Sequence, residues 1–450
     1  MAKRAYIGID LGTSGVRACA IDQRGALLGE ARAPLPPSSS TVTGHFEQAP
    51  ADWWQACLRV LDDLLRDDSL QPAAISVDGT SGTLLSCEAD GTPTGPALMY
   101  NDSRSTAEAA LLEDIAAPQA AVHSPNSALA KLMYLHRHAQ VGAAVYALHQ
   151  ADWIAARLGA PLGLSDENNA LKMGYDPLER RWPGWIARCG IDQRLLPRVL
   201  PVGRPLGELR PELARRWHCQ QPVRLIAGTT DSNAATLASG IRQIGEASTA
   251  LGSTLVLKVL SAQPVFDPAS GVYSHRLGNL WLAGGASNSG GNVLRHFFSE
   301  QQLAQLSAQI DPDSDSGLDY YPLLTPGERF PINDPDMPPR LSPRPDDQVQ
   351  FLQGLLEGIA RIEQLGYQHL HALGAPYPTR VLSSGGGASN LAWQAIRQRL
   401  LGCAVEQSVQ TEAAYGSALI AAGLFPDEGS ESAYPGIAQN AVPARSDSDP

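Results

Sequence analysis

Apolar residues at the start of the chain form two short runs that are separated by a glycine-bearing turn. Residues 5–10 and 16–21 are mostly apolar, and residues 12–15 between them read Gly-Thr-Ser-Gly. Short apolar runs bounded by turn residues are typical of buried strands. The pattern therefore predicts a strand, a tight turn and a second strand, with a third strand at 26–31.

A helix and a further strand follow. Trp54, Leu58, Leu61 and Leu65 fall at helical spacing, which predicts a helix over 51–66 that buries these four side chains. A short apolar run at 73–77 then predicts a buried strand that ends at Asp78.

The second half of the chain repeats the opening pattern. Apolar runs at 247–251 and 255–260 flank a turn of Gly252, Ser253 and Thr254. A motif that occurs once in each half indicates a duplicated α/β fold with a cleft between two domains. We place the domain boundary near Gly240, so that residues 1–240 form the first domain and residues 241–426 the second.

The rest of the second half predicts one long connection and several regular elements. Residues 311–347 are rich in Pro and Asp, whereas the apolar positions of 349–373 recur at helical spacing. A strand at 380–382 and helices at 391–401 and 412–424 follow. We expect the last helix to cross back to the first domain, and residues 427–450 to form a flexible tail.

Composition excludes several classes of partner. The 450 residues carry a net charge of −12, which argues against nucleic acid or an anionic membrane as the main partner but still permits a phosphate ligand. The six cysteines form no C-x-x-C pair, and no segment has the length and apolarity of a signal peptide or a membrane span. These features predict a cytoplasmic protein with reduced thiols.

Two aspartates follow predicted strands at positions where ligands commonly bind. Asp10 precedes the first glycine turn, where backbone N–H groups can hold a phosphate and a carboxylate can hold hydrated Mg²⁺; a plain hairpin is the alternative. Neither a Walker A loop nor a dinucleotide-binding glycine motif is present. Asp231 precedes a helix of small residues, and either a general base or a helix N-cap fits that position.

A glycine-rich loop and two polar segments are further candidates. Residues 384–390 include three consecutive glycines, which allow close approach to a flat ligand or form a mobile turn. Trp393, one helical turn after Asn390, fits an adenine contact or a core position. Residues 78–82 and 100–104 are polar segments at strand ends and are candidates for binding a polyhydroxylated substrate.

Together, these segments resemble the FGGY family of carbohydrate kinases, within the superfamily of actin, Hsp70 and sugar kinases. The resemblance covers nearly the whole chain in the same order. Its motifs lie at residues 6–22, 45–54, 130–135, 284–291, 320–331 and 385–390. It implies a two-domain actin-like ATPase fold with a nucleotide and substrate cleft, and a 311–347 connection that is ordered in part.

The resemblance also implies roles for individual residues. Asp231 would be the catalytic base, and Asp10 would position Mg²⁺ through water. The remaining implied contacts are with the phosphates (Gly12, Thr13, Ser14, Gly252, Ser253, Thr254), with adenosine (Gly386, Gly387, Asn390, Trp393) and with the sugar (Asp10, Asp78, Gly79, Thr80, Ser81, Asp102, Asp231).

The resemblance also predicts which sugar accepts the phosphate. Residues 78–83 and 100–104 look most similar to the short D-ribulose kinases, and the Met-His pair of xylulokinases is absent. We therefore expect ATP-dependent phosphorylation of D-ribulose on O5, with D-xylulose and then another polyol or sugar acid as alternatives. An actin-like or chaperone-like ATPase without a small acceptor is the alternative from another class. We expect a monomer or homodimer.

Overall fold

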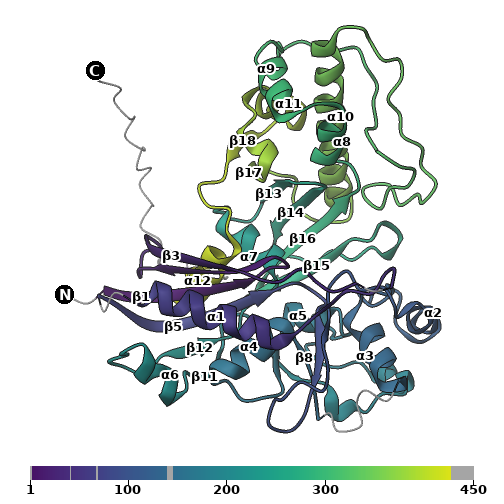
Figure 1. The fold of residues 1–450 in the computed structure, drawn as a ribbon. Helices are drawn as coiled ribbons and strands as arrows, with labels where there is room; N and C mark the ends of the chain where they lie inside the picture. Colours follow the sequence, from purple (N-terminus) through teal and green to yellow (C-terminus); the bar gives the residue numbers. More distant parts are fainter. Residues whose placement is uncertain (1–2, 41, 67–68, 139–144, 427–450) are drawn as a thin grey trace, which may run out of the picture.

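Two large sheets, one in each half of the sequence, organise the protein (Figure 1). The computed structural model describes residues 3–40, 42–66, 69–138 and 145–426. The predicted tail at 427–450 lies outside these residues.

The first sheet is built around the predicted opening strands. Antiparallel pairing joins β1 to β2 and β2 to β3, whereas β5 pairs in parallel with β1 and β12 in parallel with β5. Its strands, in spatial order, are β11 (Pro205–Glu208), β12 (Arg224–Ile226), β5 (Leu70–Gly79), β1 (Lys3–Leu11), β2 (Gly15–Ile21) and β3 (Leu27–Pro34).

The second sheet repeats this topology. Its strands, in spatial order, are β15 (Tyr273–Leu277), β16 (Leu280–Ser287), β14 (Leu255–Ser261), β13 (Glu246–Leu251), β17 (Arg380–Ser384) and β18 (Ala404–Gln407). The order β16-β14-β13-β17-β18 has the same strand directions as β3-β2-β1-β5-β12. The predicted duplication is therefore confirmed.

Helices on both faces of the first sheet bury its apolar residues. Ile7 and Ile9 pack in the core shared with α1 (Pro50–Leu64) and α4 (Gln150–Leu158), whereas Tyr6 faces the opposite side. The predicted buried face of α1 is partly wrong, because Trp53 and Cys57 are fully buried while Trp54 and Leu58 are only half-buried. A spacing pattern leaves the direction of a helical face uncertain by one residue, and the contact with the sheet decides it.

The last helix, α12 (Ala413–Ala422), crosses back onto the first sheet as predicted, between β1 and α7 (Asp231–Ala238) (Figure 1). Two glycines make this close approach possible. A Cβ at Gly8 would lie 1.9 Å from the Ala414 carbonyl oxygen, and one at Gly416 would lie 1.8 Å from the Ala234 carbonyl oxygen. Helix α12 thereby becomes part of the core that packs on the first sheet.

The remaining elements complete the two halves. The other helices are α2 (Thr106–Ile115), α3 (Ala128–Arg137), α5 (Glu167–Leu171), α6 (Pro211–Arg216), α8 (Gly291–Phe297), α9 (Glu300–Ser307), α10 (Gln348–Ala372) and α11 (Leu391–Leu401), with 3₁₀ turns at Gly184–Cys189, Gln193–Leu195, Pro268–Ser270 and Gly386–Ser389. Two small sheets contain β4 (Glu47–Gln48), β7 (Ala97–Leu98), β6 (Leu84–Cys87) and β8 (Tyr146–His149), and β10 (Arg198–Leu200) with β9 (Leu164–Asp166).

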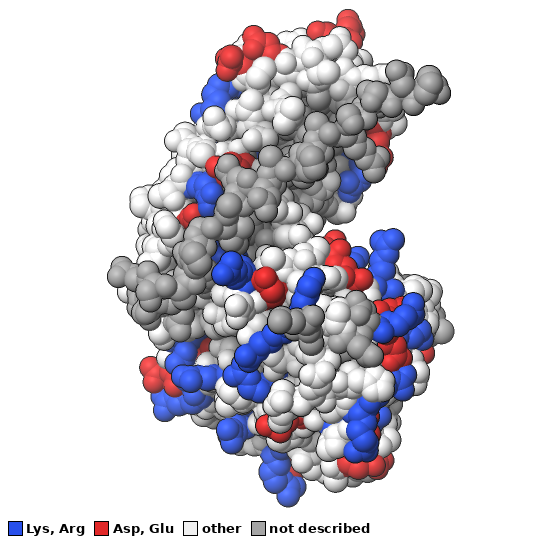
Figure 2. All heavy atoms as spheres, turned by 90° about the vertical axis from the view of Figure 1, so that its left-hand side faces the viewer, with Lys and Arg blue, Asp and Glu red and all other residues white. Residues whose placement is uncertain are grey.

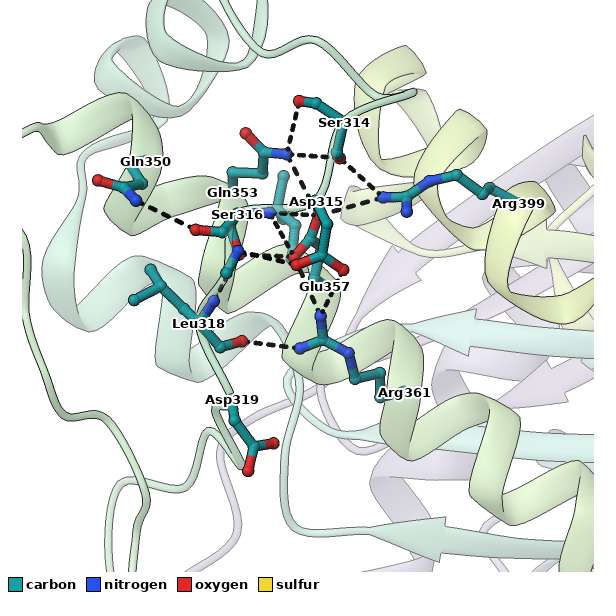
Figure 3. A network of polar contacts seen from close by, with 12 residues as sticks. Ser314, Asp315, Ser316, Leu318, Asp319, Gln350, Gln353, Glu357, Arg361 and Arg399 are labelled. Atoms are coloured by element: carbon teal, nitrogen blue, oxygen red, sulfur yellow. Dashed lines mark hydrogen bonds and ion pairs between the residues drawn. The ribbon is translucent and has the colours of Figure 1, made fainter.

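The connection between α9 and α10 is held in place by buried polar contacts. The carboxylate of Glu357, on α10, accepts hydrogen bonds from the Ser316 backbone N–H and hydroxyl (Figure 3). The guanidinium groups of Arg361 and Arg399 lie 3.2 and 3.1 Å from the same carboxylate. The expectation of partial order in this segment is therefore confirmed.

The surface carries charges of both signs. Figure 2 shows acidic and basic side chains interspersed over the lower lobe of the face it presents. Among the described residues, no helix is long and apolar enough to cross a membrane.

Candidate active site

Three aspartates meet at one edge of the first sheet. Asp10 is near the end of β1, Asp78 is near the end of β5, and Asp231 follows β12. These strands are neighbours in the sheet, and Asp10 and Asp78 are paired in register. Because the carboxyl ends of parallel strands meet at the same edge, where ligands usually bind in α/β folds, the topology brings the three carboxylates together.

Asp10 and Asp78 form a buried carboxyl pair. Their side chains interact electrostatically, Oδ1 of Asp78 is buried without a hydrogen-bond partner among the described residues, and the Ser417 hydroxyl of α12 donates to Oδ2 of Asp78 at 2.5 Å. Burial raises the pKa of both carboxyls, and for Asp78 the negative charges of Asp10 and Asp231 add to this effect. The guanidinium of Arg17, 3.2 Å from Asp10, opposes the rise in the pKa of Asp10. The pair therefore favours sharing one proton over carrying two negative charges.

Asp231 has the electrostatics of a moderate base. Burial is the main cause that raises the pKa of Asp231 to about 6, and the negative charge of Asp10 adds to this rise. The Ser232 backbone N–H and the amino groups of Lys172 and Lys258 act in the opposite direction and lower the pKa. At neutral pH the carboxylate is therefore mostly ionised. Thr230, rather than Asp231, occupies the position before the first turn of α7, so the structure does not support the N-cap alternative.

The two predicted phosphate turns are open to solvent and held by backbone contacts. The Gly12 N–H donates to the Gly15 carbonyl oxygen at 3.0 Å, while Thr13 and Ser14 remain partly or fully exposed. The side chain of Gln48 donates to the Thr13 carbonyl oxygen at 2.9 Å, which explains how the 45–54 motif supports the turn.

The second turn is anchored to the start of α8. The Gly252 and Ser253 carbonyl oxygens accept hydrogen bonds from Gly291 at 2.9 Å and from Asn292 at 3.1 Å, and Thr254 is half-buried beside them.

Two arginines beside these turns were missed by the sequence analysis. Arg17 forms ion pairs with Asp10 and Glu412, and Arg295 donates to the Ser253 hydroxyl at 3.1 Å. Hairpin register contained the signal for Arg17, because counting outward from the first turn places it opposite Asp10. Arg295 stands in no motif, and only the packing of α8 brings it to the second turn.

The predicted adenosine residues line a cavity of about 590 Å³ in the second domain, which Gly386, Gly387 and Asn390 enclose together with α8 and α9. The Asn390 side chain accepts from the Trp393 N–H at 3.0 Å and donates to the Ser307 hydroxyl at 2.8 Å. It thereby both caps α11 and joins the loop to α9.

Trp393 lines the same cavity and is otherwise packed in the core of the second half of the chain, so its contact with adenine stays a prediction. It is 1% exposed, and its indole N–H donates to the Leu356 carbonyl oxygen at 3.1 Å. A Cβ at Gly387 would lie 2.4 Å from the Trp393 ring, so the ring packs directly against this loop.

A second cavity, of about 430 Å³, lies beside Asp231. Residues of both halves of the chain line it, including Ser81, Lys172, Thr230 and Ser232 from the first half and Lys258, His275 and Arg329 from the second. The Ser81 hydroxyl is buried and has no hydrogen-bond partner within the described part of the chain, so it is available to a ligand. This cavity has the size and polarity for a small polyhydroxylated molecule.

Of the predicted sugar-binding residues only Ser81 lines this cavity, and the cavity reaches Asp231 through its neighbours Thr230 and Ser232. The others are absent from the lining: Asp10, Asp78, Gly79, Thr80, Asp102 and Asp231 itself. The Thr80 backbone N–H and hydroxyl donate to the Gln150 side chain at 3.1 and 2.9 Å, and Gly79 packs against the same residue. Asp102 is fully buried, where Arg104 and the Phe46 N–H occupy its oxygens at 2.7 Å each.

Several side chains of the polar segments at 78–82 and 100–104 are therefore engaged by other parts of the protein. Lys131 of the 130–135 motif ties them together, because its buried amino group donates to the Gly82 carbonyl oxygen at 2.8 Å and the Met99 carbonyl oxygen at 2.6 Å. Within these segments only Ser81 lines the cavity beside Asp231, and Asp78 contributes through its pairing with Asp10.

The donors around Asp10 fit a hydrated Mg²⁺. No group of three or more His, Cys, Asp or Glu side chains suited to a metal occurs within the described ranges. Mg²⁺ usually retains several waters and binds through one or two carboxylates together with substrate phosphates. A single carboxylate at the first phosphate turn meets that requirement.

This fold and site define the class of the protein as a two-domain phosphotransferase with an actin-like ATPase fold. The FGGY carbohydrate kinase N-terminal domain model matches residues 5–238, and the C-terminal domain model matches residues 247–424. The chain belongs to the FGGY family of carbohydrate kinases and is an ATP-dependent sugar kinase.

Individual relatives agree with this assignment. The chain is 26% identical over 439 residues to a xylulose kinase of Klebsiella pneumoniae, covering 93% of this chain and 89% of the relative. A crystal structure of a "xyloylose kinase" from Brucella ovis has a TM-score of 0.83 at 25% identity, covering 94% of this chain and 93% of that one. A gluconate kinase from Lactobacillus acidophilus shares the fold, with a TM-score of 0.82 at 18% identity and coverage of 93% and 88%.

Proposed function

We propose that this kinase transfers the γ-phosphate of ATP to O5 of a ketopentose, with D-ribulose as the preferred acceptor and Asp231 as the general base. The observation that carries the proposal is the polar cavity of about 430 Å³ beside Asp231. The xylulose kinase relatives support a ketopentose as the substrate class. D-xylulose is the second candidate for the same reason. The similarity of residues 78–83 and 100–104 to the short D-ribulose kinases favours D-ribulose, and Ser81 is the residue of these segments that lines the cavity.

The nucleotide occupies the adenosine cavity and both phosphate turns. Gly386, Gly387 and Asn390 hold the adenosine, and residues 12–14 and 252–254 hold the phosphates through backbone N–H groups and hydroxyls. Asp10 would hold a hydrated Mg²⁺ beside the first phosphate turn, and that ion would supply neutralisation of the phosphate charge.

Asp231 acts on the acceptor hydroxyl. A sugar hydroxyl is a weak nucleophile at neutral pH, and a carboxylate that accepts its proton also orients the oxygen toward the phosphorus. A pKa of about 6 leaves Asp231 ionised at neutral pH yet more basic than an exposed aspartate. Transfer of one proton to Asp231 accompanies formation of the new oxygen–phosphorus bond, while the bond between the γ-phosphorus and the β–γ bridging oxygen breaks and ADP leaves.

The two domains of the proposed kinase meet near Gly240. The matched family regions end at residue 238 and begin at residue 247, which supports a boundary in this segment. The first domain, residues 1–240, then carries the base and the first phosphate turn, and the second, residues 241–426, carries the adenosine site.

A coupled assay of ADP formation across a panel of sugars tests the proposal. D-ribulose, D-xylulose, ribitol, glycerol and gluconate are compared at equal concentration with ATP and Mg²⁺. The proposal expects the highest kcat/KM with D-ribulose. A preference for glycerol or gluconate would contradict it, and ATP turnover that no sugar stimulates would favour an ATPase without a small acceptor.

A further inference from the structure

Lysine is scarce in this chain and is concentrated at the cavity beside Asp231. Of the 34 Lys and Arg residues, only Lys3, Lys131, Lys172 and Lys258 are lysine. Lys131 is buried and donates to the Gly82 carbonyl oxygen, and Lys3 is exposed on β1. Lys172 and Lys258 line the cavity. A chain that uses arginine almost everywhere else therefore has a compact ammonium on a flexible stem at these two positions.

The aliphatic part of each lysine side chain sets the side from which its amino group approaches the cavity. The Lys172 side chain passes beside the loop of Ser81, because its Cδ lies 3.4 Å from the position of a Cβ on Gly82. The Lys258 side chain crosses the neighbouring strand, with its Cγ 3.0 Å from the position of a Cβ on Gly284, which also lines the cavity. One lysine therefore approaches from each half of the chain.

The amino groups are close enough to Asp231 and to each other to interact electrostatically. Both favour the ionised form of Asp231, and both disfavour the charged form of His275, another lining residue. Lys258 donates a hydrogen bond to the Asn233 side chain on α7. The amino group of Lys172 has no hydrogen bond or ion pair with any residue that the structure describes, and it is only half-buried, so its donors are free for a ligand.

The cavity wall is basic although the whole chain is acidic. Lys172, Lys258 and Arg329 line it, and none of the described residues that line it is Asp or Glu. The phosphate turns at 12–14 and 252–254 are also absent from this lining, so these basic groups face the acceptor side of the cleft.

We infer that Lys172 and Lys258 are acceptor-binding residues that hold the sugar from opposite walls, donating hydrogen bonds to its hydroxyl and carbonyl oxygens and so fixing the reacting hydroxyl against Asp231. This inference rests on the proposed function, since it assigns the cavity to the acceptor. It also specifies the acceptor class: an oxygen-rich neutral or anionic molecule binds, whereas an amino sugar is repelled.

Direct binding measurements test the inference in the absence of ATP. The affinity of the full chain for each sugar of the panel is measured by calorimetry for the wild type, Lys172→Met and Lys258→Met, with Lys3→Met as the matched control. Loss of a hydrogen bond from a charged donor typically weakens binding about 10–100-fold. We expect that loss for Lys172→Met, with an unchanged ATP affinity and melting temperature, and no change for Lys3→Met. The loss for Lys258→Met should be smaller, because burial lowers the pKa of Lys258 to about 7 and the amino group is only partly charged at neutral pH.

Two further arms separate the possible outcomes. Lys172→Arg, which keeps the charge and donors, should retain more affinity than Lys172→Met. A wild type that binds gluconate but no ketopentose refutes the proposed substrate, and the lysine variants are then judged on gluconate. Unchanged sugar affinity in Lys172→Met, or a wild type that binds no sugar of the panel, overturns the inference.

Discussion

Replacing Asp231 by Asn tests the proposed chemistry most directly. The substitution keeps the size of the side chain and an oxygen that can accept the Ser232 N–H, which lies 2.7 Å from Oδ1 in this structure. It removes the ability to accept a proton. It also removes one negative charge from the surroundings of Asp10 and Asp78, which relieves repulsion in a buried site.

The expected loss in kcat follows from the role of a general base. Such a base typically contributes about 10²–10⁴-fold to the rate, equivalent to roughly 3–5 kcal/mol of activation free energy. Asp231→Asn should therefore lose about that much kcat with D-ribulose, while its ATP affinity and melting temperature stay within error of the wild type or the melting temperature rises slightly.

Asp347→Asn is the matched control for helix capping. Asp347 is the N-cap of α10, where its side chain accepts from the Val349 N–H at 2.9 Å, and Asn caps helices about as well as Asp. This variant should keep normal kcat and stability. Steady-state rates in the ADP-coupled assay, calorimetry with ATP and thermal melting supply the measurements. Near-normal phosphorylation by Asp231→Asn would refute the base assignment.

Three other predictions address the remaining parts of the site. Asp10→Asn should lower kcat strongly at ordinary Mg²⁺ without unfolding the protein, as circular dichroism would check; full activity would exclude the metal role. In a pH profile, kcat/KM should fall as the pH drops below about 6, because the raised pKa of Asp231 means that the proton-accepting form is lost there; a profile that is flat down to pH 5 would contradict this. Gly387→Ala should raise KM for ATP and lower the melting temperature because its Cβ meets Trp393, whereas Gly386→Ala, whose Cβ meets nothing within 4 Å, should leave the melting temperature unchanged; equal melting temperatures would show that the loop adapts freely.

Local patterns in the sequence were sufficient to predict most of the framework. The strand–turn–strand at β1 and β2, its repeat at β13 and β14, and the long helix α10 all follow from short apolar runs or helical spacing. Such patterns report which residues are buried and with what period, and this information is local. The position of Asp231 after a strand and before a helix was also visible, and its proposed role came from the family resemblance.

The tertiary structure alone decided which polar residues face the ligand cavities. Asp102 and Thr80 stand in polar segments that look suited to sugar binding, but partners far away in the sequence, Phe46 and Gln150, occupy their polar atoms. Trp393 is 1% exposed and yet lines the cavity beside Gly386 and Gly387, a combination that its place in the sequence did not decide. Whether a polar group is free for a ligand depends on long-range partners, which a local pattern does not contain.

The lysines beside Asp231 show that residues outside any sequence motif can also line the cavity. Neither Lys172 nor Lys258 belongs to a polar motif, and they are 86 positions apart in the sequence, yet both line the cavity that the two halves of the chain form together. Short apolar runs in the sequence predicted the two repeated sheets and the sheet edges that we propose bind ligands. Packing of one half against the other decided which side chains share the cavity, because that contact joins residues whose separation along the chain carries no information about their distance in space.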